Sequence, residues 1–267
     1  MNQYSHYFEV NKQAWNVRTG IHKDSSFYDL EGFKNGLSSL KQIELQELGS
    51  VRNKTLLHLQ CHFGMDTISW SRLGAEATGI DFSEDAIELA TELNEELGCN
   101  AKFVCANVYD LKAHLRAVYD IVFTSYGVIG WLPDLDEWAA IISNYVKPGG
   151  TFYMVEFHPI VWMMDDNFSY IKYNYFNTSV IEEEITGTYA DRNAPVKLSE
   201  YGWNHPFSEI INALLTHGFT LEFLHEFPYS PFNCFNNLEQ GDDGNWRIKN
   251  MNEKIPMVYS MKATKKV

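Results

Sequence analysis

Residues 56–66 read Leu-Leu-His-Leu-Gln-Cys-His-Phe-Gly-Met-Asp, and this stretch has a clear strand–turn–helix pattern. Its first four residues indicate a buried strand, and a tight turn around Gly64 leads straight into a helix predicted over residues 67–73. A second strand, residues 77–80, ends at Asp81. In open α/β sheets, ligands bind beyond the carboxyl ends of such strands. The turn and Asp81 are therefore the first candidates for a binding site.

The same alternation of strand and helix continues along the chain. Ser83 is a good N-cap for a helix that Gly98 ends. Further strands are predicted over residues 101–104, 119–124, 151–157, 220–227 and 257–263, and further helices over residues 135–146 and 207–217, with a turn at residues 147–150. Alternation of this kind implies an α/β fold with a parallel sheet and right-handed crossovers.

Two regions lie outside this alternation. The N-terminal stretch has a helical pattern rich in aromatic residues, and residues 159–206 have strand-like composition at residues 170–176 and 180–189. We therefore predict three parts: an N-terminal helical lid, a core and an inserted β-rich cap. The lid is residues 1–49, the core residues 50–158 and 207–267, and the cap residues 159–206.

Composition and charge narrow the function classes. The chain has 267 residues, 45% of them hydrophobic, which suffices for one substantial core. A formal net charge of −14 repels phosphate backbones, so nucleic acid is not expected as a partner.

The four cysteines form no C-x-x-C pair, and no metal site is expected. With no signal-peptide pattern and no apolar run of the ~20 residues that span a membrane, we expect a cytoplasmic protein without membrane contact. Its oligomeric state is left open.

Five motifs follow one another in a recognisable order. They are the turn at residues 57–64, Asp81 at the end of the second strand, residues 105–111, residues 119–126 and residues 146–150. Together they resemble the class I S-adenosylmethionine-dependent methyltransferases over about 100 residues. An acid placed like Asp81, 17 residues beyond Gly64, also suits hydrogen bonds to two ribose hydroxyls.

Four residues depart from the family pattern. His58 stands where the family usually carries an acid, and Gln60 and His62 stand where it carries glycines. Asn107 replaces the Asp of most members, but its amide oxygen can still accept a hydrogen bond from an adenine amino group. We interpret His58 as a hydrogen-bonded histidine at the edge of the core. The bulkier turn is expected to affect cofactor affinity and not the fold.

The resemblance implies a fold and a cofactor. The fold is a Rossmann-like, doubly wound, mostly parallel sheet of seven strands with an antiparallel last strand, and the cofactor is S-adenosyl-L-methionine. Asp81 would bind the ribose, Phe82 would flank the adenine, and Tyr126 or Trp131 would face the sulfonium cation through an aromatic ring. The full set of implied cofactor contacts is Gln60, His62, Gly64, Asp66, Asp81, Phe82, Ser83, Asn107, Val108, Ser125, Tyr126 and Gly127.

A methyl acceptor is expected near the ends of the fourth and fifth strands, under the lid and the cap. We expect the acceptor to be a small molecule. The negative net charge of the chain argues against nucleic acid, and enclosure by the lid and the cap argues against a protein substrate. The candidate substrate and lid residues are Trp15, Arg18, His22, Tyr28, Trp131, Trp162 and His205. His158 is our candidate general base, because histidine titrates near neutrality, with Glu156 and His205 as rivals. His205 has a second interpretation, as a residue that orders the following helix.

Two other function classes stay open. A nicotinamide-dependent oxidoreductase also uses a turn, a helix and a ribose-binding acid, but this chain lacks the G-x-G-x-x-G pattern and ends in the strand expected of a methyltransferase. A non-catalytic S-adenosylmethionine-binding module is the second alternative, favoured by the bulk of Gln60 and His62.

Overall fold

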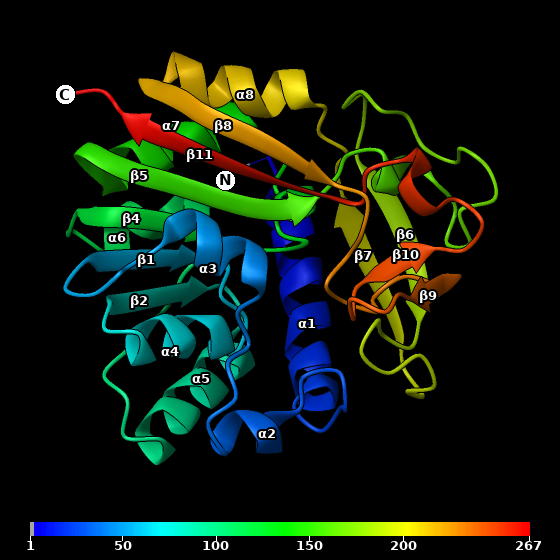
Figure 1. Cartoon of the computed structure of the whole chain (residues 1–267), viewed down its shortest axis with the longest axis horizontal. Coiled ribbons are helices and arrows are strands. Elements are labelled where there is room, and N and C mark those ends of the chain that lie inside the picture. The colour runs from blue at the N-terminus through cyan, green and yellow to red at the C-terminus, as the bar shows by residue number, and fades with distance from the viewer. Residues whose placement is uncertain (1–2) are drawn as a thin grey trace.

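The computed structural model describes residues 3–267, in which seven strands form one sheet (Figure 1). Its order is β3-β2-β1-β4-β5-β11-β8, and of these strands β11 runs antiparallel to both of its neighbours. The strands are β1 (Thr55–Leu59), β2 (Glu76–Asp81), β3 (Lys102–Cys105), β4 (Tyr119–Thr124), β5 (Val146–Phe157), β8 (Phe219–Phe227) and β11 (Val258–Lys265). The predicted Rossmann-like sheet is confirmed, and its order reverses between β1 and β4, where a ligand crevice is expected.

Helices cover both faces of the sheet. One face carries α3 (Gln42–Leu48), α4 (Met65–Arg72) and α5 (Glu84–Glu96), and the other carries α6 (Leu111–His114), α7 (Leu135–Tyr145) and α8 (Phe207–Thr216). Trp70 of α4 and Trp138 of α7 are fully buried on opposite faces, so each face has its own apolar core. Ser83 caps α5 as predicted, since its hydroxyl accepts a 3.2 Å hydrogen bond from the amide of Ala86.

Strand β5 begins five residues earlier than predicted. Its ladder with β4 pairs Tyr119 with Val146 and then Ile121 with Thr151, so residues 147–150 bulge out of the sheet. Gly149 has a φ of 73° in this bulge, which agrees with the turn chemistry of the sequence.

A cap of two antiparallel hairpins lies beside the carboxyl ends of the parallel strands (Figure 1). β6 (Ile181–Thr186) and β7 (Lys197–Gly202) fall within the predicted cap, whereas β9 (Leu238–Gln240) and β10 (Trp246–Ile248) come from the connection between β8 and β11 and were not predicted. The strand expected over residues 170–176 is wrong. That segment forms one isolated bridge, between Met164 and Ile171, because strand-like composition without a partner strand makes no ladder.

The lid begins with α1 (Ser5–His22), followed by α2 (Leu30–Lys34). α1 joins the sheet to the cap: Lys12 forms a 2.9 Å ion pair with Glu84 of α5, and the Asn11 side chain makes two 2.8 Å hydrogen bonds with the backbone of Tyr201 in β7. Met1 and Asn2, also assigned to the lid, lie outside the described residues.

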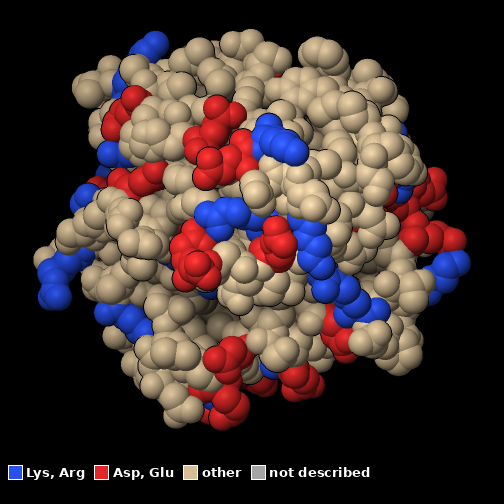
Figure 2. All heavy atoms as spheres, turned by 45° about the vertical axis from the view of Figure 1, so that its right-hand side comes forward, with Lys and Arg blue, Asp and Glu red and all other residues tan. Residues whose placement is uncertain are grey.

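Surface charge is mixed on the face that carries the cap, where acidic side chains lie beside Lys and Arg (Figure 2). Among residues 3–267, no helix is long and apolar enough to cross a membrane.

Candidate active site at the carboxyl edge of the sheet

The turn after β1 has the backbone of a glycine-rich loop although it carries one glycine. Gln60, His62 and Gly64 have φ values of 54°, 50° and 76°. A left-handed conformation costs a side-chain-bearing residue about 1–2 kcal/mol, so the chain keeps the loop geometry at the expense of stability. Gly64 has a further requirement, because a Cβ there would lie 2.5 Å from the Phe103 ring. The two departures from the family pattern therefore preserve the fold of the turn.

Asp81 ends β2 with its carboxylate turned toward this turn. Its two oxygens accept hydrogen bonds from the backbone amides of His62 at 2.8 Å and Ser83 at 3.0 Å. Burial raises the pKa of Asp81 to about 6, against the opposing effect of the backbone donors. Each oxygen keeps a lone pair for a further donor. The carboxylate is thus oriented by the protein and still able to bind vicinal hydroxyls.

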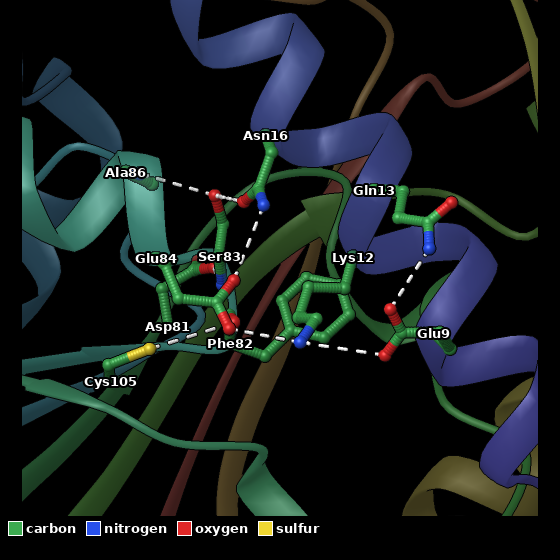
Figure 3. Close-up of polar contacts among 10 residues, drawn as sticks. All are labelled: Glu9, Lys12, Gln13, Asn16, Asp81, Phe82, Ser83, Glu84, Ala86 and Cys105. Carbon is green, nitrogen blue, oxygen red and sulfur yellow. Dashed lines mark hydrogen bonds and ion pairs between the residues drawn. The ribbon is translucent and has the colours of Figure 1, made fainter.

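Helix α1 crosses directly over this end of β2 (Figure 3). Asn16 accepts a 2.6 Å hydrogen bond from the Ser83 hydroxyl and donates to Glu84 at 3.3 Å. Phe82, which follows Asp81 in the chain, is drawn in the same view. Helix α1 is therefore attached to the residues that follow Asp81, an attachment that sequence analysis did not foresee for Lys12 and Asn16.

Four buried polar atoms beside the turn have no hydrogen-bond partner among the described residues. They are Nη1 of Arg18, Nε2 of His22, Oε1 of Gln60 and Nδ1 of His62. His22 and His62 are in direct contact, with 3.1 Å between Nδ1 and Nε2, and Gln60 donates its amide to the carbonyl of Val128 at 3.0 Å. Buried polar groups in proteins are nearly always paired. These four atoms are the groups to which a polar ligand or water in this site would hydrogen-bond.

Aromatic rings enclose the cluster. The Arg18 guanidinium lies 5.0 Å from the ring centre of Trp15 and 5.5 Å from that of Trp131, and it forms an ion pair with Glu200 of the cap. Trp15 also meets the His62 ring edge-on at 5.1 Å. Trp15, Arg18 and Trp131 were each predicted as substrate or lid residues, and they lie near one another, with the ring face of Trp131 directed at Arg18. Glu200 carried no signal in the sequence beyond its place in a cap.

Tyr28 and Tyr189 close the other side of the paired histidines. Tyr28 stacks on His22 with ring centres 5.2 Å apart, and its hydroxyl lies 2.5 Å from that of Tyr189. Burial raises the pKa of both phenols. Tyr28 was predicted as a lid residue, whereas Tyr189 was not singled out, because it comes from a loop of the cap.

His58 and two predicted cofactor contacts, Asp66 and Tyr126, have hydrogen-bond partners outside the cluster. His58 bridges Thr67 at 2.9 Å and Ser125 at 3.0 Å, as our interpretation of a hydrogen-bonded core-edge histidine requires, and burial lowers its pKa to about 3. Asp66 accepts a 2.5 Å hydrogen bond from Ser39. The Tyr126 hydroxyl donates to Glu44 of α3 at 3.0 Å, so its side chain points away from the turn.

The third motif supplies a cap for a short helical turn. The Asn107 side-chain oxygen accepts a 3.0 Å hydrogen bond from the amide of Tyr109, which uses one of its two lone pairs. Val108 is buried in the core cluster under α7. Asn107 therefore keeps one lone pair that could accept a hydrogen bond from an adenine amino group. Because the Val108 side chain is buried in the core, only its backbone could contact an adenine.

Glu156 is not arranged as a general base. Its buried carboxylate accepts hydrogen bonds from four backbone amides, those of Gly127, Val128 (2.7 Å), Ile129 (3.2 Å) and Phe157 (2.6 Å). These donors fill the lone pairs of both oxygens. Glu156 thus holds the loop after β4 in place, and Gly127, with a φ of 76°, supplies the turn that directs its amide at the carboxylate.

His158 and His205 are occupied in the same way. His158 accepts from the amide of Ile160 at 3.1 Å, and its other nitrogen lies 2.9 Å from Glu226, so neither nitrogen faces the cluster. His205 lies 2.8 Å from the carbonyl of Leu132 and 3.0 Å from Glu209, which agrees with its second interpretation as a residue that orders α8. Both carry structural hydrogen bonds because the loops after β5 and before α8 are buried.

Trp162 is the remaining substrate candidate, and it lies outside the cluster. Its half-exposed ring packs edge-on against Phe157 and Phe235 of the cap region. Within residues 3–267, no group of three or more His, Cys, Asp or Glu side chains is arranged to hold a metal ion.

Comparison with known proteins agrees with this arrangement. A family model described as a methyltransferase domain matches residues 56–150. A ubiquinone biosynthesis O-methyltransferase of Saccharophagus degradans is 30% identical over 148 residues, covering 54% of this chain and 62% of that protein. The protein of the same name from Chromobacterium violaceum is 29% identical over 142 residues, covering 53% and 59%. The chain thus spans about three fifths of the length of these curated relatives.

Solved structures share the fold. A putative S-adenosylmethionine-dependent methyltransferase of Listeria monocytogenes superposes with a TM-score of 0.62 at 21% identity, covering 84% of this chain and 96% of that one. The DhpI protein, solved as a complex with SAH, superposes with a TM-score of 0.57 at 14% identity over 98% of both chains. Residues 56–150 therefore match the methyltransferase-domain family, and the chain has the fold of the class I S-adenosylmethionine-dependent methyltransferases.

Proposed function

We propose that this protein transfers the methyl group of S-adenosylmethionine to a small-molecule acceptor by in-line displacement. The observation that carries the proposal is the juxtaposition of Asp81 with four unpartnered buried polar atoms at the point where the sheet order reverses. The matched methyltransferase domain covers the same strands and supports the same reaction class.

The residues present fit this cofactor. Asp81 keeps acceptor capacity for ribose hydroxyls, Asn107 keeps one lone pair for an adenine amino group, and His62 and Gln60 offer unpaired polar atoms in the turn. When bound, the cofactor supplies an electrophilic methyl group on a sulfonium that is a good leaving group. The protein's own contribution is then to bind, orient and exclude water.

Helix α1 is suited to exclude water from the site. It is tied to α5 by Lys12 and Asn16 and to the cap by Asn11 and Arg18, so it closes the carboxyl edge of the sheet from above. An enclosed site of this kind suits a small molecule better than a polymer. We also propose a cytoplasmic location, in keeping with four cysteines that are all unpaired.

An oxygen atom is the first acceptor to consider. The relatives quoted above are O-methyltransferases by name, although this chain spans only part of their length. The aromatic rings around the paired histidines suit a planar acceptor that carries a hydroxyl group.

The test is product analysis. The purified protein is incubated with S-adenosylmethionine and, separately, a set of substituted phenols, a primary amine and a thiol, and mass spectrometry follows S-adenosylhomocysteine and the methylated product. We expect both products with at least one acceptor class and neither with an Asp81→Ala variant. Binding of S-adenosylhomocysteine without any methylated product would favour the non-catalytic binding module, which the side chains of Gln60 and His62 in the turn also support.

A further inference from the structure

His22 and His62 form a contact that no expected role explains. His22 ends α1 and His62 lies in the turn after β1, 40 residues apart in sequence, with Nδ1 of His22 and Nε2 of His62 3.1 Å apart. His22 is fully buried. The outer nitrogens, Nε2 of His22 and Nδ1 of His62, are both buried and have no partner among residues 3–267.

Both rings are uncharged at neutral pH. Burial lowers the pKa of His22 to about 3 and lowers the pKa of His62 well below its ordinary value, and the nearby Arg18 acts in the same direction. Within the described residues, no carboxylate forms an ion pair with either ring. Tyr28 and Tyr189 contact the rings and bond to each other through their hydroxyls, and the Asp81 carboxylate accepts from the backbone amide of His62.

Neutral imidazoles impose a strict hydrogen-bond count. Each ring has one N–H and one lone pair, and the contact between them uses one of each. Whichever ring donates, one outer nitrogen then carries a hydrogen and the other carries a lone pair. The pair therefore presents one donor and one proton acceptor to whatever completes the site.

We propose that the His22–His62 pair takes the proton that a hydroxyl-bearing aromatic acceptor loses when it is methylated, an inference that rests on the proposed function. The O–H bond breaks and a new N–H bond forms on the outer nitrogen that carries the lone pair. The oxygen's electron pair forms the bond to the methyl carbon, while the carbon–sulfur bond breaks and its pair stays on sulfur.

Burial opposes a charge on either ring, and the transfer offsets this because the sulfonium charge is lost as the pair gains its proton. Arg18 is neutralised by Glu200, so a pair that stayed protonated would oppose the binding of a sulfonium cation. One positive charge disappears from sulfur as one appears on the pair, so the net charge of the enclosed site is the same before and after the transfer. The second ring lets the proton move away from the acceptor oxygen along the 3.1 Å contact.

The test uses a series of phenols of increasing acidity, with His22→Asn as the variant and His217→Asn as the matched control. His217 is a histidine in a surface ion pair with Asp136. We expect His22→Asn to lower the methylation rate of weakly acidic phenols about 100-fold, a typical size for loss of a proton acceptor. The loss should shrink steadily as the phenols become acidic enough to ionise in solution, and His217→Asn should follow the wild type across the series.

Each result has one meaning. An equal loss across the phenol series would make the pair structural and overturn the inference. Methylation of the amine or thiol but of no phenol would overturn it while leaving the proposed function intact, and binding of S-adenosylhomocysteine without methylation of any phenol would also overturn it. Failure of the wild type to bind S-adenosylhomocysteine would instead refute the proposed function. Nitrogen NMR of the histidine rings in the S-adenosylhomocysteine complex gives an activity-independent check: we expect two neutral rings of the same tautomer, since the Nδ1–Nε2 contact requires both to be Nδ1–H or both Nε2–H. A charged ring at neutral pH would contradict the inference.

Discussion

Two groups of buried polar side chains lie at the carboxyl edge of the same sheet, and they differ in how completely they are paired. At the end of β5, the Glu156 carboxylate accepts four backbone hydrogen bonds and both nitrogens of His158 are occupied. Between the turn and α1, Arg18, His22, Gln60 and His62 each keep one buried atom unpaired. An unpaired buried polar atom costs stability, so the second group is understandable where a ligand supplies the missing partners.

The fully paired group should matter most for stability. Glu156→Gln replaces two acceptor lone pairs by an NH₂ group that faces backbone N–H donors, leaving about two of them unpaired. We expect the free energy of unfolding to fall by about 4 kcal/mol, with 1–3 kcal/mol for each unpaired buried group.

Chemical denaturation measures this loss directly. The matched control is Glu184→Gln, which changes a 63% exposed side chain in an ion pair with Lys197, and we expect it to cost less than about 1 kcal/mol. Equal losses for the two variants would show that the backbone bonds to Glu156 do not stabilise the loop after β4.

The unpaired group should affect how the free energy of unfolding depends on pH. The pKa of His22 is lowered from 6.5 to about 3, so the folded protein binds fewer protons than the unfolded chain between these values. The free energy of unfolding should therefore fall as pH falls through this window. His22→Asn removes that contribution, and the slope should become shallower by up to about 1.4 kcal/mol per pH unit.

His217→Asn serves as the comparison here as well, since this histidine is part of an exposed ion pair. Denaturation at a series of pH values would give both slopes. An unchanged slope in His22→Asn would mean that His22 is accessible to protons in the folded protein, and the distinction between the two groups would lose its basis.

The smallest effect is expected in the turn. Gln60→Gly relieves a left-handed residue that costs about 1–2 kcal/mol but increases the freedom of the unfolded chain and removes the bond to Val128. The net change in the free energy of unfolding should stay within about 1 kcal/mol. A loss well above this value, measured by denaturation, would show that the Gln60 side chain is essential to the loop after β4.

The fold could be predicted from local signals to a large extent. Apolar runs placed the seven strands, and Ser83 and Gly98 marked the ends of α5, because these effects act between neighbours in sequence. The cap could not be predicted as well. Strand composition at residues 170–176 found no partner, and the β9–β10 hairpin depends on tertiary contacts of short segments.

The site divides in a similar way. Asp81 and His62 lie at or just beyond the ends of strands and were selected by that position, but Glu156 and His158 lie at the end of a strand too and bond to the backbone instead. Sequence position tells which residues reach the edge of the sheet and not which backbone amides converge on them. The contact of His22 with His62 joins two elements whose approach depends on how α1 docks, so no local pattern could have revealed it.

On our proposal, S-adenosylmethionine binds between Asp81 and the unpaired cluster. Calorimetric titration with S-adenosylhomocysteine, on the wild type and an Asp81→Ala variant and with NADH as the competing ligand class, tests it most directly. We predict a dissociation constant near micromolar, about −8 kcal/mol of binding free energy, loss of binding in the variant and none for NADH. Wild-type protein that binds NADH, or that fails to bind S-adenosylhomocysteine, would contradict the account.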